Sequence, residues 1–187
     1  MINKQKIVIA ILLVVSVAGT TFAQGKYFTK SAALSFEAST PLENIEAKNT
    51  KGTFVLDASN GAVEVAVLLK AFEFERALMQ EHFNENYVES DKYPKSVFKG
   101  KISNISDVNF SKDGTYPVTI TGKLTLHGVT KDVSTKGAII IKGGKINAKN
   151  DFIIAVADYN IEIPAVVKDK VAKNVKIHTS AWLDPLK

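Results

Sequence analysis

Cysteine is absent from the 187 residues of this chain. Its absence excludes disulfide bonds, thiol nucleophiles, iron–sulfur clusters and zinc sites built on cysteine. It also excludes the lipid anchor of a lipoprotein, which is attached to a cysteine that follows an apolar leader. The fold and any binding site must therefore depend on packing and on ordinary hydrogen bonds.

Arginine is almost absent as well. Arg76 is the only one, although the chain carries 24 basic and 19 acidic residues and a net charge of +5. Proteins that read bases or clamp phosphates usually rely on arginine, because its flat guanidinium offers two parallel donors. A charge carried by scattered lysines indicates solubility instead, so we expect no nucleic-acid partner.

Long apolar runs are also scarce, and the main one lies near the start of the chain. Residues 7–18 follow a positively charged start and are too short for a membrane span, which needs about 20 apolar residues. Thr21 and Ala23 then supply the small side chains of a cleavage site. We therefore predict a secretory signal peptide over residues 1–23, a domain over residues 24–187, and export to the periplasm or beyond. A membrane anchor is the alternative.

Most of the remaining sequence alternates between apolar and polar residues. This period of two is typical of antiparallel strands with one buried face. About eight such segments suit a small closed barrel, although a two-layer sandwich fits the same pattern. Glycines inside several segments predict the bends at which a barrel turns a corner. The alternating segments are residues 28–38, 52–56, 63–69, 118–126, 133–141, 146–156 and 175–181, together with an extended segment after Pro94.

One stretch departs from this alternation. Phe74, Leu78, Met79 and Phe83 recur at helical spacing, which predicts a short helix with one apolar face. We expect this helix to close or line one end of the barrel. The polar residues that follow it predict a loop, and residues 164–173 predict a single helical turn.

No catalytic or metal-binding motif accompanies these elements. The chain lacks a nucleophile elbow, a zincin pair of histidines and a glycine-rich phosphate loop. Its three histidines, His82, His127 and His178, are far apart in sequence and would have to meet in space to bind a metal. Gly128 predicts a tight turn beside His127, so we interpret His127 as structural. We expect neither catalysis nor a cofactor.

Three blocks of the sequence resemble signatures of the YceI-like family. Residues 78–100 contain a helical segment, an acidic loop, Lys-Tyr-Pro and a strand with Phe-Lys-Gly. Residues 122–131 read Gly-Lys-Leu-Thr-Leu-His-Gly-Val-Thr-Lys, and residues 158–161 read Asp-Tyr-Asn-Ile. The chain departs from the family at Ala157, where many members have arginine, and at Asn160, where glycine is common.

The resemblance implies an all-β fold: an antiparallel, eight-stranded, lipocalin-like β-barrel with one short helix and a helical turn. It also implies non-catalytic binding of a long-chain apolar lipid, an isoprenoid above all, inside the barrel. A shift of one residue inverts both faces of a strand, so the pattern leaves the inward face open. We assign inward the face with the longer apolar run and no lysine. The residues expected to line the site, with those of the helix, are Phe74, Leu78, Met79, Phe83, Phe98, Ile120, Leu124, Leu126, Ile139, Ile141, Phe152 and Ile154.

Three alternatives stay open. The barrel could serve as the substrate tunnel of a periplasmic enzyme, or its side chains could fill it as a ligand-free structural barrel. An outer-membrane barrel also fits eight alternating strands, but the chain has only one Trp and five Tyr for two interfacial girdles. We expect a chain that does not span the membrane, and we leave a homodimer open.

Overall fold

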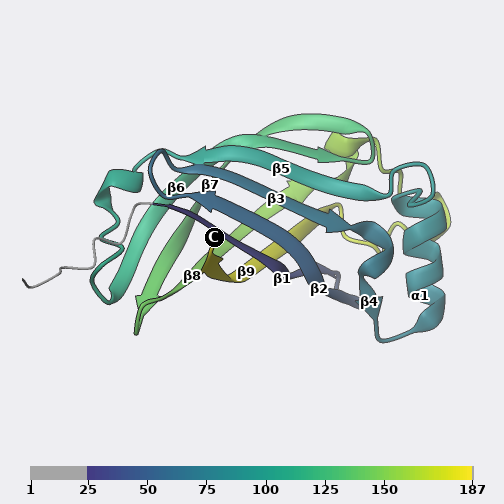
Figure 1. Cartoon of the computed structure of the whole chain (residues 1–187). Coiled ribbons are helices and arrows are strands. Elements are labelled where there is room, and N and C mark those ends of the chain that lie inside the picture. Colours follow the sequence, from purple (N-terminus) through teal and green to yellow (C-terminus); the bar gives the residue numbers. More distant parts are fainter. Residues whose placement is uncertain (1–24, 187) are drawn as a thin grey trace, which may run out of the picture.

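The alternating segments form one antiparallel sheet that closes on itself, as the computed structural model in Figure 1 shows for residues 25–186. The strand order is β1-β9-β8-β7-β6-β5-β3-β2-β4, and β1 also pairs with β2. Eight long strands thus make a barrel, which confirms the predicted fold; the signal peptide predicted over residues 1–23 lies outside the described residues. The strands are β1 (Lys26–Ser39), β2 (Asn44–Asp57), β3 (Ala62–Leu68), β4 (Glu73–Phe74), β5 (Lys95–Ile102), β6 (Gly114–Leu126), β7 (Val129–Lys142), β8 (Lys145–Ala155) and β9 (Asn174–Pro185).

The helical segment is shorter than predicted. Phe74 belongs to β4 and pairs with Ala47 of β2, so it does not share a helix face with the later residues. Helix α1 (Ala77–His82) begins only after the extended residue Arg76 and continues into a π-helical turn, η2 (Phe83–Tyr87), where a loop was predicted. Four 3₁₀ turns complete the structure: η1 (Leu69–Ala71), η3 (Ile105–Asp107), η4 (Val156–Tyr159) and η5 (Ala165–Val167). Within residues 25–186, no helix is both long and apolar enough to cross a membrane.

Strands β5 and β6 face each other through a pair of glycines. Gly100 pairs with Gly122, and the ring of Phe98 covers both. A Cβ atom on Gly122 would lie 2.7 Å from Cζ of Phe98, which is closer than side-chain carbons approach one another. These two positions therefore need glycine because an inward-pointing aromatic ring takes the space of their side chains.

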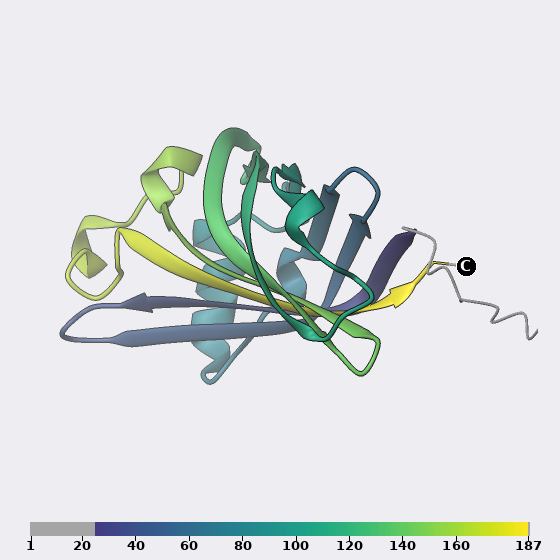
Figure 2. The same ribbon diagram turned by 90° about the vertical axis from the view of Figure 1, so that its left-hand side faces the viewer.

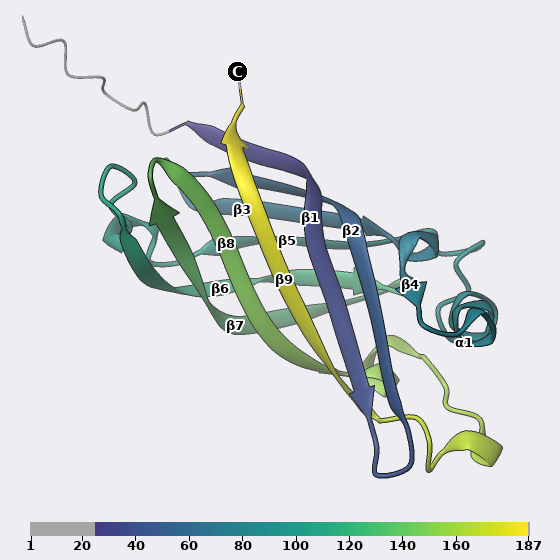
Figure 3. The ribbon, with the colours of Figure 1, turned by 90° about the horizontal axis from the view of Figure 1, so that it is seen from below.

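The barrel widens toward the end that carries α1. Pairing between β7 and β8 stops at Gly137 and Asn150, and beyond that point β7 continues beside β6 only and β8 beside β9 only. Pairing between β2 and β3 is likewise limited to residues 53–56 of β2. Figures 2 and 3 show the β6–β7 hairpin diverging from β8 and β9 at this end. The opposite end is narrow and is filled by packed side chains such as Ile146 and Leu183.

Candidate functional site: an apolar cavity inside the barrel

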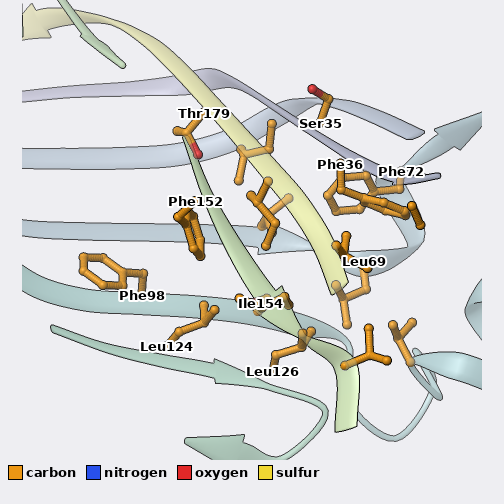
Figure 4. A pocket seen from close by; sticks show the side chains of 18 of the residues that line it. Ser35, Phe36, Leu69, Phe72, Phe98, Leu124, Leu126, Phe152, Ile154 and Thr179 are labelled. Carbon is orange, nitrogen blue, oxygen red and sulfur yellow. The ribbon is translucent and has the colours of Figure 1, made fainter. Parts of the chain in front are cut away.

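A cavity of about 510 Å³ occupies the wide half of the barrel. This volume lies in the range of typical small-molecule sites. Its wall is the inner face of the strands, and its rim includes exposed residues of α1 and of the segment around η5. Figure 4 shows apolar side chains of several strands and connecting segments converging on this space.

The face that we assigned inward does face the interior. All of the residues proposed for the site line the cavity except Ile141. Ile141 is buried but pairs with Gly114 and Ile146 near the β7–β8 turn, at the packed narrow end. Leu78 lies at the rim and is 61% exposed, so it contributes little buried surface. That these side chains bind a ligand stays a prediction.

The wall of the inner part of the cavity comes mainly from β5, β6, β7 and β8. Leu124 and Ile139 are buried there, and Phe98, Ile120 and Phe152 are partly buried against the same core. Alternation places these residues inward because side chains two apart on a strand share a face. The inner wall is therefore almost entirely hydrocarbon.

Four phenylalanines from four segments form an aromatic cluster between this inner region and the rim. Phe83 of η2 has its ring centroid 5.1 Å from that of Phe74 and 5.4 Å from that of Phe36. Phe72 lies 5.3 Å from Phe36 and 5.9 Å from Phe83. Such contacts favour a fixed arrangement of rings beyond what simple burial provides. Our sequence reasoning did not assign Phe36 or Phe72 to the site, although Phe36 follows the inward period of β1.

The rim carries the charged groups of the site. The guanidinium of Arg76, just before α1, donates to the carboxylate of Glu43 at the turn between β1 and β2. Both residues border the cavity, as do the exposed His82 and Lys170. Tyr87 also borders it, and burial raises the pKa of its phenol, so this hydroxyl is neutral at physiological pH. Most charged groups that border the cavity thus lie at its entrance, and Lys149, which also borders it, is exposed.

A hydrogen-bonded junction beside the cavity joins the three sequence blocks that carry the family resemblance. His127 donates from Nδ1 to the carbonyl oxygen of Tyr159, at 3.0 Å, and its Nε2 lies 2.7 Å from Oε2 of Glu89. The His127 ring meets the Tyr93 ring edge-on at 4.7 Å. Gly128 completes the turn with a φ of +73°, and a Cβ there would collide with Tyr93. The junction bridges the end of the β6–β7 hairpin to the segment after β8, across the place where β7 and β8 separate.

The histidines do not gather into a chemical site. His127 is held in that junction, His82 is exposed on α1, and His178 lies on the outer face of β9, 2.8 Å from Oδ1 of Asp151. In the part of the chain that the structure describes, no three His, Asp or Glu side chains are grouped in a way that could hold a metal ion.

Comparisons with known proteins agree with this architecture. A family model described as the YceI-like domain matches residues 26–182. The chain is similar to a polyisoprenoid binding domain from Saccharophagus degradans implicated in plant cell wall breakdown, with 13% identity, a TM-score of 0.76, and coverage of 87% of this chain and 99% of that chain.

Two further solved structures are similar. BcnA from Burkholderia cenocepacia aligns with 16% identity, a TM-score of 0.68, and coverage of 82% of this chain and 96% of that chain. A YCEI protein from Campylobacter jejuni aligns with 14% identity, a TM-score of 0.53, and coverage of 100% and 92%. At these identities the likeness shows a shared fold. Among curated proteins, none matches this sequence.

Proposed function

This chain belongs to the YceI-like domain family, and from that premise we propose that it binds a long-chain apolar lipid, of the isoprenoid class, inside its barrel and without catalysis. The observation that carries the proposal is the apolar cavity of about 510 Å³, whose inner wall is almost entirely hydrocarbon and most of whose charged groups lie at the rim. The solved domain from Saccharophagus degradans, described as polyisoprenoid binding, supports the isoprenoid class.

Such a cavity binds a long hydrocarbon by the hydrophobic effect alone. Each methylene that moves from water into an apolar site contributes about 0.8 kcal/mol, so a long chain needs no charged anchor. The cavity opens beside α1, which lets a chain enter at one end. The scattered histidines support the non-catalytic part of the proposal, because among residues 25–186 no side chain on the inner wall lies within hydrogen-bonding distance of a histidine that could activate it as a nucleophile.

We further propose that the protein is exported. The leader predicted over residues 1–23 supports this, and a lipid carrier with a closed barrel is suited to move an apolar molecule through an aqueous compartment.

The proposal is tested by extracting the purified full-length protein with organic solvent and identifying the extract by mass spectrometry. Wild type should release an isoprenoid or similar lipid. Ile120→Trp places a larger ring in the cavity, so it should exclude the lipid at a stability cost of about 1–3 kcal/mol. Ile153→Trp is the matched control, because Ile153 lies on the outer face of β8 and is 66% exposed.

Two results would overturn the proposal. The first is a wild-type protein that carries no lipid and takes up none when mixed with isoprenoids. The second is an Ile120→Trp variant that carries as much lipid as wild type, since the cavity would then not be the site. A ligand-free packed barrel would be the better description in the first case.

A further inference from the structure

Polar side chains interrupt the apolar wall of the cavity at a few positions, and two of them lie opposite each other on neighbouring strands. Asn150 of β8 and Thr179 of β9 are direct cross-strand partners, and both line the cavity. They share the inward face with Phe152 and Ile177, and Figure 4 shows Thr179 close to Phe152. Gly137, the partner of Asn150 on β7, packs closely beside the pair, since a Cβ atom there would lie 2.5 Å from the carbonyl oxygen of Lys149 and 3.4 Å from Cβ of Asn150. The side chains of directly opposed residues lie about 5 Å apart, so one ligand group can reach both.

Asn49 and Ser96, two other polar side chains of the inner face, are satisfied by the protein. Asn49 donates to the carbonyl of Leu68 at 3.0 Å and accepts from the backbone N–H of Lys51 at 2.8 Å. The hydroxyl of Ser96 donates to the carbonyl of Thr125 at 3.0 Å. Buried polar groups are costly when they lack partners, so these residues are structural and do not need a ligand.

Asn150 and Thr179 differ in this respect. The Nδ2 amide of Asn150 donates to the carbonyl of Lys136 at 2.9 Å and to the hydroxyl of Thr135 at 3.1 Å. Because a carbonyl can only accept, the nitrogen must lie on that side, and the oxygen Oδ1 is left free. Within residues 25–186, neither Oδ1 of Asn150 nor the Thr179 hydroxyl has a hydrogen-bond partner.

The chemistry of the pair defines the group that it can hold. Oδ1 of Asn150 can only accept, so the ligand group must donate a hydrogen bond, while the Thr179 hydroxyl can donate to the oxygen of that same group. Among residues 25–186, the cations that border the cavity point away from the pair: Arg76 and Lys170 lie at the rim, and Lys149 is exposed and alternates with the inward Asn150 on β8. A neutral hydroxyl meets all of these conditions.

We propose that Asn150 and Thr179 bind the hydroxyl group of a neutral lipid alcohol whose chain fills the cavity. This proposal rests on the proposed lipid-binding function and adds a preference for a particular polar end. A hydrocarbon without the hydroxyl leaves both protein groups unpaired inside the wall, and an unpaired buried polar group weakens binding.

A competition experiment tests the preference. The full-length protein is mixed with equal amounts of geranylgeraniol and the hydrocarbon of the same chain without the hydroxyl, then re-isolated, extracted and measured by mass spectrometry. Wild type should enrich the alcohol about tenfold, as expected from the net contribution of the hydrogen bonds that its hydroxyl would make with Asn150 and Thr179. Thr179→Val keeps the shape and should reduce the enrichment severalfold, whereas Thr179→Ser should retain it. Thr121→Val, on the exposed outer face of β6, is the matched control and should behave as wild type.

The outcomes separate this proposal from the one on which it rests. Uptake of neither compound by wild type contradicts lipid binding and the hydroxyl site together. Equal uptake of both compounds by wild type leaves lipid binding intact and overturns the hydroxyl site. Enrichment of the alcohol that persists in Thr179→Val also overturns it, because the hydroxyl would then be held elsewhere.

Discussion

At the scale of single residues, His127 has contacts that a surface histidine would not need. Its side chain is only 10% exposed, it contacts Glu89 and Tyr159 through both ring nitrogens, and its ring packs on Tyr93. Its Nδ1 faces the carbonyl oxygen of Tyr159 and its Nε2 faces the carboxylate of Glu89, so removal of the ring would leave both oxygens without this partner. His127→Ala should therefore lower the free energy of unfolding by about 1–3 kcal/mol and leave the bound lipid in place.

Urea denaturation measures this change as a lower midpoint at an unchanged slope. His82→Ala is the control, because His82 is exposed and makes no side-chain hydrogen bond within the described part of the chain, so its midpoint should stay near that of wild type. A folded His127→Ala protein that has lost all lipid would contradict the structural interpretation and assign His127 to ligand binding.

At the scale of elements, α1 and η2 form part of the wall at the wide end of the barrel. Phe83 makes more of the packing contacts of this segment than its other residues do. Phe83 packs on Phe36 and Phe74 in the aromatic cluster, whereas Leu78 in the same helical segment is 61% exposed. Phe83→Ala should lower the free energy of unfolding by about 2 kcal/mol, less than for a fully buried ring, and should reduce the lipid recovered by extraction. Leu78→Ala should change the stability by less than about 0.5 kcal/mol.

Thermal or chemical denaturation of the two variants, with lipid extraction from each, makes the comparison. Equal losses of stability would mean that the helix is held by its whole surface instead of by Phe83. Unchanged lipid content in Phe83→Ala would mean that the aromatic cluster closes the end of the barrel without touching the ligand.

The elements also show why the sequence predicts some features and misses others. Period-two alternation predicts the long strands, because one buried face repeated over ten or more residues is a strong signal. β4 has two residues, too few for any period, so Phe74 was placed in the neighbouring helix. The π-helical turn η2 consists mostly of polar residues, and a polar segment without a hydrophobic period predicts a loop.

The sequence likewise predicts some residues of the site and misses others. Alternation assigns Phe98, Ile120 and Ile139 to one face, and the structure places that face inward. Alternation does not give the position of a residue along the barrel axis, so it could not separate Ile141 in the packed narrow end from Ile139 beside the cavity. Asn150 and Thr179 fall in the inward period of their strands, but only the pairing register shows that these two polar residues lie directly opposite each other.

At the scale of the whole molecule, the barrel closes through its first strand. β1 begins at Lys26 and pairs with both β2 and β9, and the backbone of Gly25 already accepts a hydrogen bond from the N–H of Ala58. Cleavage after Ala23 would leave every residue of this closing strand in place. We therefore predict that the exported protein starts at Gln24 and retains the complete barrel.

Cell fractionation and intact-mass measurement of protein expressed with its leader test this prediction. Wild type should be found in the periplasmic fraction or the medium with the mass of residues 24–187. Ala23→Arg should block cleavage, because the position before the cut needs a small side chain, and the uncleaved chain should stay with the membrane. Phe22→Leu is the control, since the position between the two small residues tolerates a large side chain, and it should be processed as wild type. Wild-type protein that keeps its first 23 residues would show that they serve as a membrane anchor, and the barrel would then bind its lipid while held at the membrane surface.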